Sequence, residues 1–81
     1  MKTVKSITHK KLGREKAHGQ AFQDEGVIEI DSRLKGLDHL DTVIHEILHC
    51  QNPRWGEAKV IGHSNEMSQL LWDLGYRRID V

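Results

Sequence analysis

The stretch that decides the fold of this chain is LDHLDTVIHEILHCQ, residues 37–51. Its apolar residues recur every three or four positions, which places them on one face of an α-helix; they are Leu37, Leu40, Val43, Ile44, Ile47 and Leu48. Asp38 can cap the start of this helix. On a helical wheel the apolar stripe centres near Leu40, Ile44 and Ile47. We therefore predict a helix over this segment with one strongly apolar face.

The same segment contains an HExxH motif, formed by His45, Glu46 and His49. Two histidines four residues apart lie one turn above each other on a helix, close enough to bind one cation. Glu46 projects about 100° away, which suits a base that takes a proton from water beside the metal better than it suits a ligand. The histidine pair lies almost opposite the apolar stripe. We expect one face of the helix to cover a sheet and the other to face a second helix.

A second helical pattern covers residues 55–74, after a break around Pro53, the single proline of the chain. It ends at Gly75, a residue type that commonly follows a helix C-terminus. Hydrophobic periodicity predicts its inward face, which contains Val60, Ile61, Met67, Leu70, Leu71 and Leu74 together with Glu57, Ser64 and Ser68. The two helices should therefore form an antiparallel hairpin.

A catalytic zinc site needs a third protein ligand, and the candidates downstream of the motif are Glu57, His63 and Glu66. In a hairpin that turns near Pro53, position 57 lies level with His49, so the geometry favours Glu57. Glu66 points to the polar side of the second helix, and His63 lies beyond the level of the metal. The alternative is that Glu57 is a first-turn acid that interacts only with the helix dipole.

The residues before the first helix predict three strands, over residues 2–9, 19–23 and 26–31, with a turn at 13–16. The expected fold class is α+β: a small antiparallel or mixed three-stranded sheet, followed by the helical hairpin that contains HExxH. Without a linker or an internal repeat, residues 1–81 should form a single zincin-like domain.

Composition narrows the classes of function. Lys plus Arg and Asp plus Glu both number 12, so the formal net charge of zero argues against nucleic acid as the main partner. Residues 1–8 contain no apolar run of the length that a signal peptide or a membrane span requires. The single cysteine, Cys50, is expected to be a buried thiol, which fits a reducing compartment. We therefore expect a cytoplasmic protein without membrane contact.

Four segments together resemble a known family: IEIDSRL at 28–34, TVIHEILH at 42–49, EAKV at 57–60 and LWDLGYR at 71–77. They are similar to small phage and bacterial metallopeptidases of the gluzincin type, the minigluzincin, ImmA/IrrE-like or SprT-like group. The resemblance covers about residues 19–77. It implies a zinc cofactor, a peptidase activity, and a chain that is cytoplasmic and phage-encoded.

The resemblance also implies roles for individual residues. The ligand glutamate of the family, on its second helix, corresponds to Glu57. In related gluzincins an extended substrate pairs with an edge strand, and the matching positions here are Gln20, Ala21 and Phe22. His63 and Tyr76 are candidates for donating a hydrogen bond to the tetrahedral intermediate, as a histidine, tyrosine or arginine does in related peptidases. The alternative for both residues is that they complete the core.

The leading hypothesis is a zinc-dependent metallopeptidase in which Glu46 activates the attacking water, with an extended peptide or an unfolded protein segment as substrate. The alternative is a metal-stabilised peptide-binding module with little or no hydrolytic activity. This alternative predicts a closed zinc site with four protein ligands, completed by His63 or Cys50. A third class, an accessory protein of DNA or chromatin as in some SprT-like relatives, is disfavoured by the neutral charge.

Overall fold

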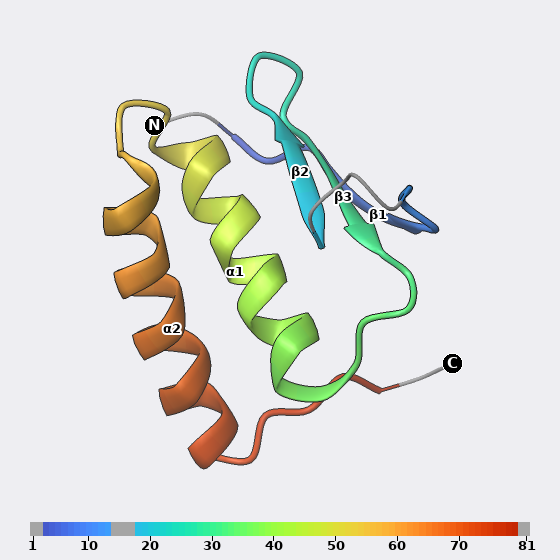
Figure 1. The fold of residues 1–81 in the computed structure, drawn as a ribbon, viewed down its shortest axis with the longest axis vertical. Helices are drawn as coiled ribbons and strands as arrows, with labels where there is room; N and C mark the ends of the chain where they lie inside the picture. The colour runs from blue at the N-terminus through green and yellow to red at the C-terminus, as the bar shows by residue number, and fades with distance from the viewer. Residues whose placement is uncertain (1–2, 14–17, 80–81) are drawn as a thin grey trace.

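The chain folds into three layers, in which the first helix lies between a sheet and the second helix (Figure 1). The computed structural model describes residues 3–13 and 18–79. Its elements are the strands β1 (Ser6–Lys10), β2 (Gly19–Phe22) and β3 (Val27–Asp31), followed by the helices α1 (Gly36–Gln51) and α2 (Glu57–Asp73). The predicted α+β class, a small sheet followed by a helical hairpin, is confirmed.

The sheet is mixed, with strand order β1-β3-β2. β1 runs parallel to β3, and β2 runs antiparallel to it. β3 is the central strand of the sheet. Its Ile28 and Ile30 are fully buried, whereas β1 is exposed along its whole length. The first strand lies at Ser6–Lys10, later than the predicted residues 2–9. Of the predicted turn at 13–16, residues 14–16 lie outside the described part of the chain.

The turn between β2 and β3 depends on Gly26. Its backbone has a φ of 69°, a conformation that residues other than glycine rarely adopt. A Cβ atom there would lie 2.5 Å from the carbonyl oxygen of Thr3. The N–H of Gly26 donates to the carbonyl of Phe22 at 2.9 Å, and its carbonyl accepts from the N–H of Lys5 at 2.7 Å. This turn therefore joins the start of the chain to the β2–β3 hairpin.

The two faces of α1 divide the apolar residues between two clusters. Val43, Ile47 and Cys50 pack against β3, where Ile28 and Ile30 complete the first cluster. The second cluster lies between the helices and contains Leu40, Ile44, Leu48, Trp55, Val60 and Leu71. The prediction that Leu40 and Ile44 cover the sheet was therefore wrong. A helix buried between two layers needs an apolar stripe on each side, and these residues belong to the side that faces α2.

The buried face of α2 is narrower than its hydrophobic pattern predicts. Val60, Ser64 and Ser68 are buried and Leu71 is half-buried, as expected. The prediction was wrong for four residues, which are 42–75% exposed: Ile61, Met67, Leu70 and Leu74. The two buried serines are four residues apart and allow a close approach of the helices, so the contact follows one thin stripe and leaves the outer apolar side chains in solvent.

The helix ends differ in how well the sequence predicts them. Gly75 has a φ of 100° and follows Leu74, the C-cap of α2. Its N–H donates to the carbonyl of Trp72, and that of Tyr76 donates to the carbonyl of Leu71, at 3.0 and 3.1 Å. This is the Schellman pattern that a glycine after a helix predicts. Asp38, in contrast, is not the cap of α1, because the helix begins earlier and its N-cap has no side-chain hydrogen bond.

Candidate metal centre

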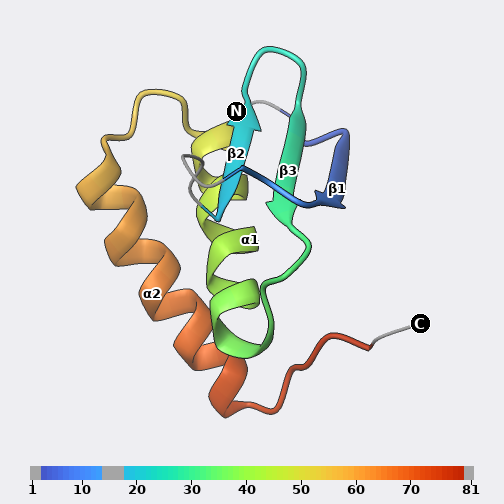
Figure 2. The same ribbon diagram turned by 45° about the vertical axis from the view of Figure 1, so that its right-hand side comes forward.

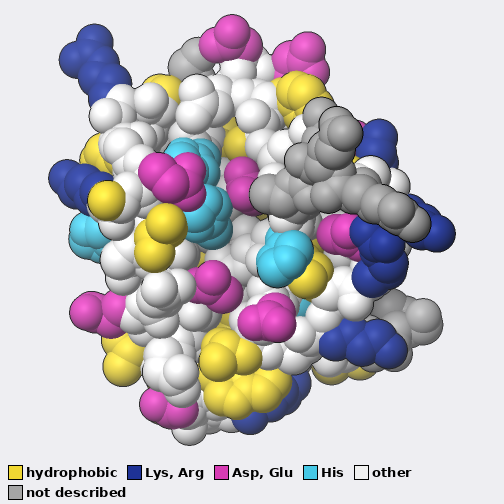
Figure 3. Space-filling view, viewed as in Figure 1, with side chains coloured by type: hydrophobic (Ala, Val, Ile, Leu, Met, Phe, Trp, Pro, Cys, Tyr) yellow, Lys and Arg dark blue, Asp and Glu magenta, His cyan; other side chains and the backbone are white. Residues whose placement is uncertain are grey.

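Three candidate ligand residues from the two helices lie close together. His45 and His49 lie one turn apart on α1, with their Nε2 atoms 3.2 Å from each other. Glu57, the first residue of α2, places Oε1 at 2.7 Å from Nε2 of His45 and Oε2 at 3.1 Å from Nε2 of His49. Figure 3 shows histidine and acidic side chains gathered on the face of the molecule where the helices run side by side. The predicted juxtaposition of these three residues is confirmed.

The spacing of these atoms fits a metal ion. All three ligand atoms lie within 4.8 Å of one another. Zinc bonds of about 2.0–2.1 Å in a tetrahedral site place neighbouring ligand atoms roughly 3.3 Å apart, close to the separations found here. Two imidazole nitrogens and one carboxylate oxygen are also a donor set that suits zinc. The group could therefore hold a metal ion, with His45, His49 and Glu57 as its ligands.

The C-terminal end of α1 and the N-terminal end of α2 position the candidate ligands. His49 lies in the last turn of α1, where backbone carbonyls lack partners within the helix. The side-chain amide of Gln23, in the β2–β3 turn, donates to the carbonyl of His49 at 2.8 Å. Glu57 lies in the first turn of α2, where a negative charge interacts favourably with the helix dipole. The dipole interaction and a ligand role are thus compatible at this position.

Glu46 lies beside the histidine pair but outside the ligand group. It is 8% exposed, and its carboxylate has no hydrogen-bond partner among the described residues. Burial raises the pKa of the Glu46 carboxyl, and the negative charge of Glu57 adds to this effect, while His45 and His49 lower the pKa. A buried carboxylate with a raised pKa is suited to accept and return a proton.

Glu46, His45 and Glu57 border a cavity of about 300 Å³. Besides residues of the motif, its walls include His18 at the start of β2 and Asn65 on α2. These two polar residues were not predicted as parts of the site, because no local spacing relates either of them to HExxH. Only the packing of β2 and α2 against α1 brings them to the same cavity.

β2 lies at the edge of the sheet and reaches the same cavity through Gly19. The carbonyl of His18 accepts a hydrogen bond from the N–H of Asp31 at 2.7 Å, so these two residues form a hydrogen-bonded pair. Because such pairs alternate along an antiparallel ladder, the N–H and C=O groups of Gly19 and Ala21 point away from β3. They are positioned to bind a further extended strand.

The three predicted substrate residues have different environments. Gln20 donates to the carboxylate of Glu29 on the neighbouring strand at 2.6 Å. Ala21 packs against the core of the sheet, and Phe22 is 41% exposed at the end of the strand. Of the three, Ala21 presents its backbone to the side of β2 away from β3, and Phe22 presents an apolar side chain to solvent.

The other candidate residues lie elsewhere. His63 packs against Trp55 with the two rings tilted and their centroids 4.9 Å apart, and Tyr76 follows α2 at the opposite end of the hairpin. Glu66 is exposed on α2. Cys50 is fully buried against the sheet, as predicted. None of these four residues borders the cavity beside Glu46 or belongs to the ligand group, as far as the described residues show.

Comparison of the chain with protein-family models, with curated proteins and with solved structures found no match. The resemblance to gluzincins thus stays a prediction that depends on the motifs. No helix within residues 3–13 and 18–79 has the length and apolar character that a membrane crossing requires.

Proposed function

We propose that this chain is a zinc-dependent metallopeptidase of the gluzincin type. The observation that supports this most is the convergence of His45, His49 and Glu57 from two helices. Glu46 lines one cavity together with two of them, His45 and Glu57. A zinc ion at this position would polarise the carbonyl of a peptide bond and lower the pKa of a water molecule. The protein would contribute the binding of the peptide and the transfer of the proton.

Glu46 is the residue that transfers the proton. Its carboxylate accepts a proton from the attacking water and then delivers it to the nitrogen of the leaving amine. Burial raises the pKa of this carboxyl and so makes the carboxylate a stronger base toward the attacking water. Because no side chain hydrogen-bonds to the carboxylate among the described residues, it is available to a water in the cavity.

The edge of β2 supports an extended peptide as substrate. A peptide that pairs with the outward backbone groups of Gly19 and Ala21 continues into the cavity, because Gly19 borders it. The backbone pairing is independent of the peptide's sequence. This favours an unfolded segment over a folded protein surface.

The alternative, a metal-stabilised peptide-binding module, requires a closed metal site. The proposed fourth ligands for such a site were His63 and Cys50. His63 packs against Trp55, and Cys50 packs against the sheet. A zinc ion held by the three candidate ligands, the one such group among the described residues, would keep a fourth position for water. This observation favours the enzyme over the binding module.

Glu46→Gln tests the proposal. The variant should bind one zinc per chain like the parent protein but lose hydrolysis of an unfolded protein by about 10²–10⁴-fold. Metal analysis and a fluorescent casein assay measure the two properties. Glu66→Gln, an exposed change on α2, serves as the matched control and should keep full activity. A parent that contains zinc but cleaves neither casein nor a diverse peptide library would refute the peptidase.

A further inference from the structure

A second cavity lies at the other end of the helical hairpin, between the N-terminal end of α1 and the segment that follows α2. Its volume is about 410 Å³, within the range of small-molecule sites. It shares no lining residue with the cavity beside Glu46. His39, which lines it, precedes His45 by six residues, or about 9 Å along the helix axis. The views in Figures 1 and 2 agree that the chain after α2 passes this end of α1.

The inner wall of this cavity is apolar. It combines the indole ring of Trp72 with three half-buried aliphatic side chains, those of Leu34, Leu40 and Val43. The absence of a side chain at Gly36 keeps the space beside the indole open, since a Cβ atom there would lie 3.6 Å from the ring. A flat apolar group therefore finds an apolar surface on which to pack.

The rim of the cavity is basic. Lys35, His39, Arg77 and Arg78 contribute to it, and none of the described residues that line the cavity is acidic. The described acidic residues adjacent in sequence to lining residues do not line it; they are Asp31, Asp38, Asp41 and Asp73. In a chain with a net charge of zero, this local excess of positive charge favours a negatively charged ligand.

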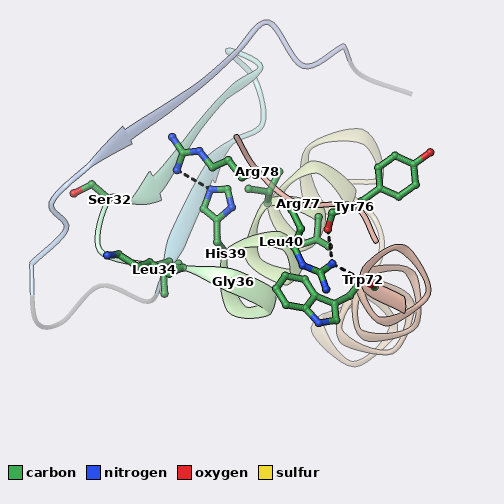
Figure 4. Close-up of a pocket in the computed structure, with 11 residues that line it drawn as sticks. Ser32, Leu34, Gly36, His39, Leu40, Trp72, Tyr76, Arg77 and Arg78 are labelled. Carbon is green, nitrogen blue, oxygen red and sulfur yellow. Dashed lines mark hydrogen bonds between the residues drawn. The ribbon is translucent and has the colours of Figure 1, made fainter. Parts of the chain in front are cut away.

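Contacts with Trp72 and Tyr76 fix the position of the guanidinium group of Arg77. It lies 3.4 Å above the centroid of the Trp72 ring, and its Nη1 donates to the carbonyls of Trp72 and Tyr76 at 2.9 and 2.8 Å. Figure 4 shows these bonds, and the contact of Arg78 with His39 beside them. The donors on Nε and Nη2 of Arg77 have no partner among the described residues. Because stacking already orders this side chain, binding an anion costs it little entropy.

We propose that this cavity binds a small aromatic anion, whose carboxylate or phosphate group binds at Lys35, Arg77 and Arg78. Its flat ring packs on the aliphatic side chains of the inner wall and on the edge of the Trp72 indole, because Arg77 covers one face of that indole. The two anionic groups share the geometry that a guanidinium fork recognises. The site is separate from the metal centre and does not depend on the proposed peptidase activity.

Titration of the full-length, isotope-labelled protein with 2-naphthoate, monitored by NMR, tests this proposal. We expect the signals of Lys35, Gly36 and His39 and the indole N–H of Trp72 to shift, while the backbone signal of Glu57 stays in place. The neutral analogue 2-naphthalenemethanol should bind at least about tenfold more weakly, because it lacks the charge-assisted contacts. A parallel titration with 2-naphthyl phosphate identifies the preferred anion by its tighter binding.

Two variants test the basic rim. Lys35→Gln and Arg78→Gln should each weaken 2-naphthoate binding by about threefold to tenfold. Arg54→Gln, an exposed arginine outside the cavity, is the matched control and should bind like the parent. All three positions are exposed, and equal melting temperatures would verify that the variants fold. Equal affinity for the neutral analogue, unchanged affinity in both rim variants, or shifts confined to the metal centre would overturn the proposal.

Discussion

Gly19 is the position where a single added carbon atom tests the arrangement of the candidate site. A Cβ atom on Gly19 would lie 3.1 Å from each of three atoms: the carbonyl oxygen of Glu29, Cγ of Glu46 and Cγ2 of Thr42. One of the three is a backbone atom and cannot move aside without distorting β3. Gly19→Ala therefore requires shifts of a few tenths of an ångström between β2 and its neighbours β3 and α1, and it presses against the side chain of Glu46.

We expect the free energy of unfolding of Gly19→Ala to fall by about 1–3 kcal/mol, the usual range for overpacking. Peptide hydrolysis should fall by about tenfold to a hundredfold, because the displaced carboxylate is the proposed base. Urea unfolding and the casein assay measure these two effects. Zinc content should stay at the parent level, since the added methyl group approaches none of the three ligands.

Gly62→Ala is the matched control for this substitution. Gly62 lies in α2, and a Cβ atom there meets nothing within 4 Å. The change should stabilise the protein by up to about 1 kcal/mol through helix propensity and leave hydrolysis unchanged. If Gly19→Ala kept the parent stability within about 0.5 kcal/mol and the parent activity, the close packing of β2 on Glu46 would be wrong.

Three other predictions concern the ligands and the titrating groups. Glu57→Ala should lose zinc affinity while His63→Ala keeps it, and metal analysis showing the reverse would exclude Glu57 as the third ligand. Glu46→Gln should raise the melting temperature of the metal-free protein at neutral pH, because burial raises the pKa of this carboxyl and disfavours its charge; a lower melting temperature would contradict this. Hydrogen bonds from Arg33 lower the pKa of Asp31 from 3.8 to about 2, so its stabilisation is present above pH 3.8 and is lost as the pH falls toward 2. The gap in unfolding free energy between the parent and Asp31→Asn should close over this interval, and a gap that stays constant would argue against the ion pair.

Local sequence patterns predicted the elements and the centre of the site well. The spacing of apolar residues located α1 to within one residue of its observed start, and Gly75 predicted the end of α2. The distance of four residues between His45 and His49 and the mirror position of Glu57 predicted which side chains meet. These predictions succeeded because each depends on the period of one helix or on the length of one turn.

Predictions that needed contacts between layers succeeded less well. Met67 and Leu70 have helical spacing but lie in solvent, because the buried serines of α2 bring the helices together along a different stripe. Leu40 and Ile44 pack on α2 and not on the sheet. Hydrophobicity shows that a residue can be buried, but the partner surface decides whether it is.

The sequence by itself determined the helices, the turn glycines and which residues form the candidate metal group, because backbone geometry converts residue spacing directly into a shared helical face. Only the tertiary structure decided that β1 pairs parallel to β3, that His18 and Asn65 join the cavity beside Glu46, and that Lys35 and Arg77 meet at one pocket. These residues lie far apart along the chain. Their proximity results from the packing of whole elements, which no local period encodes.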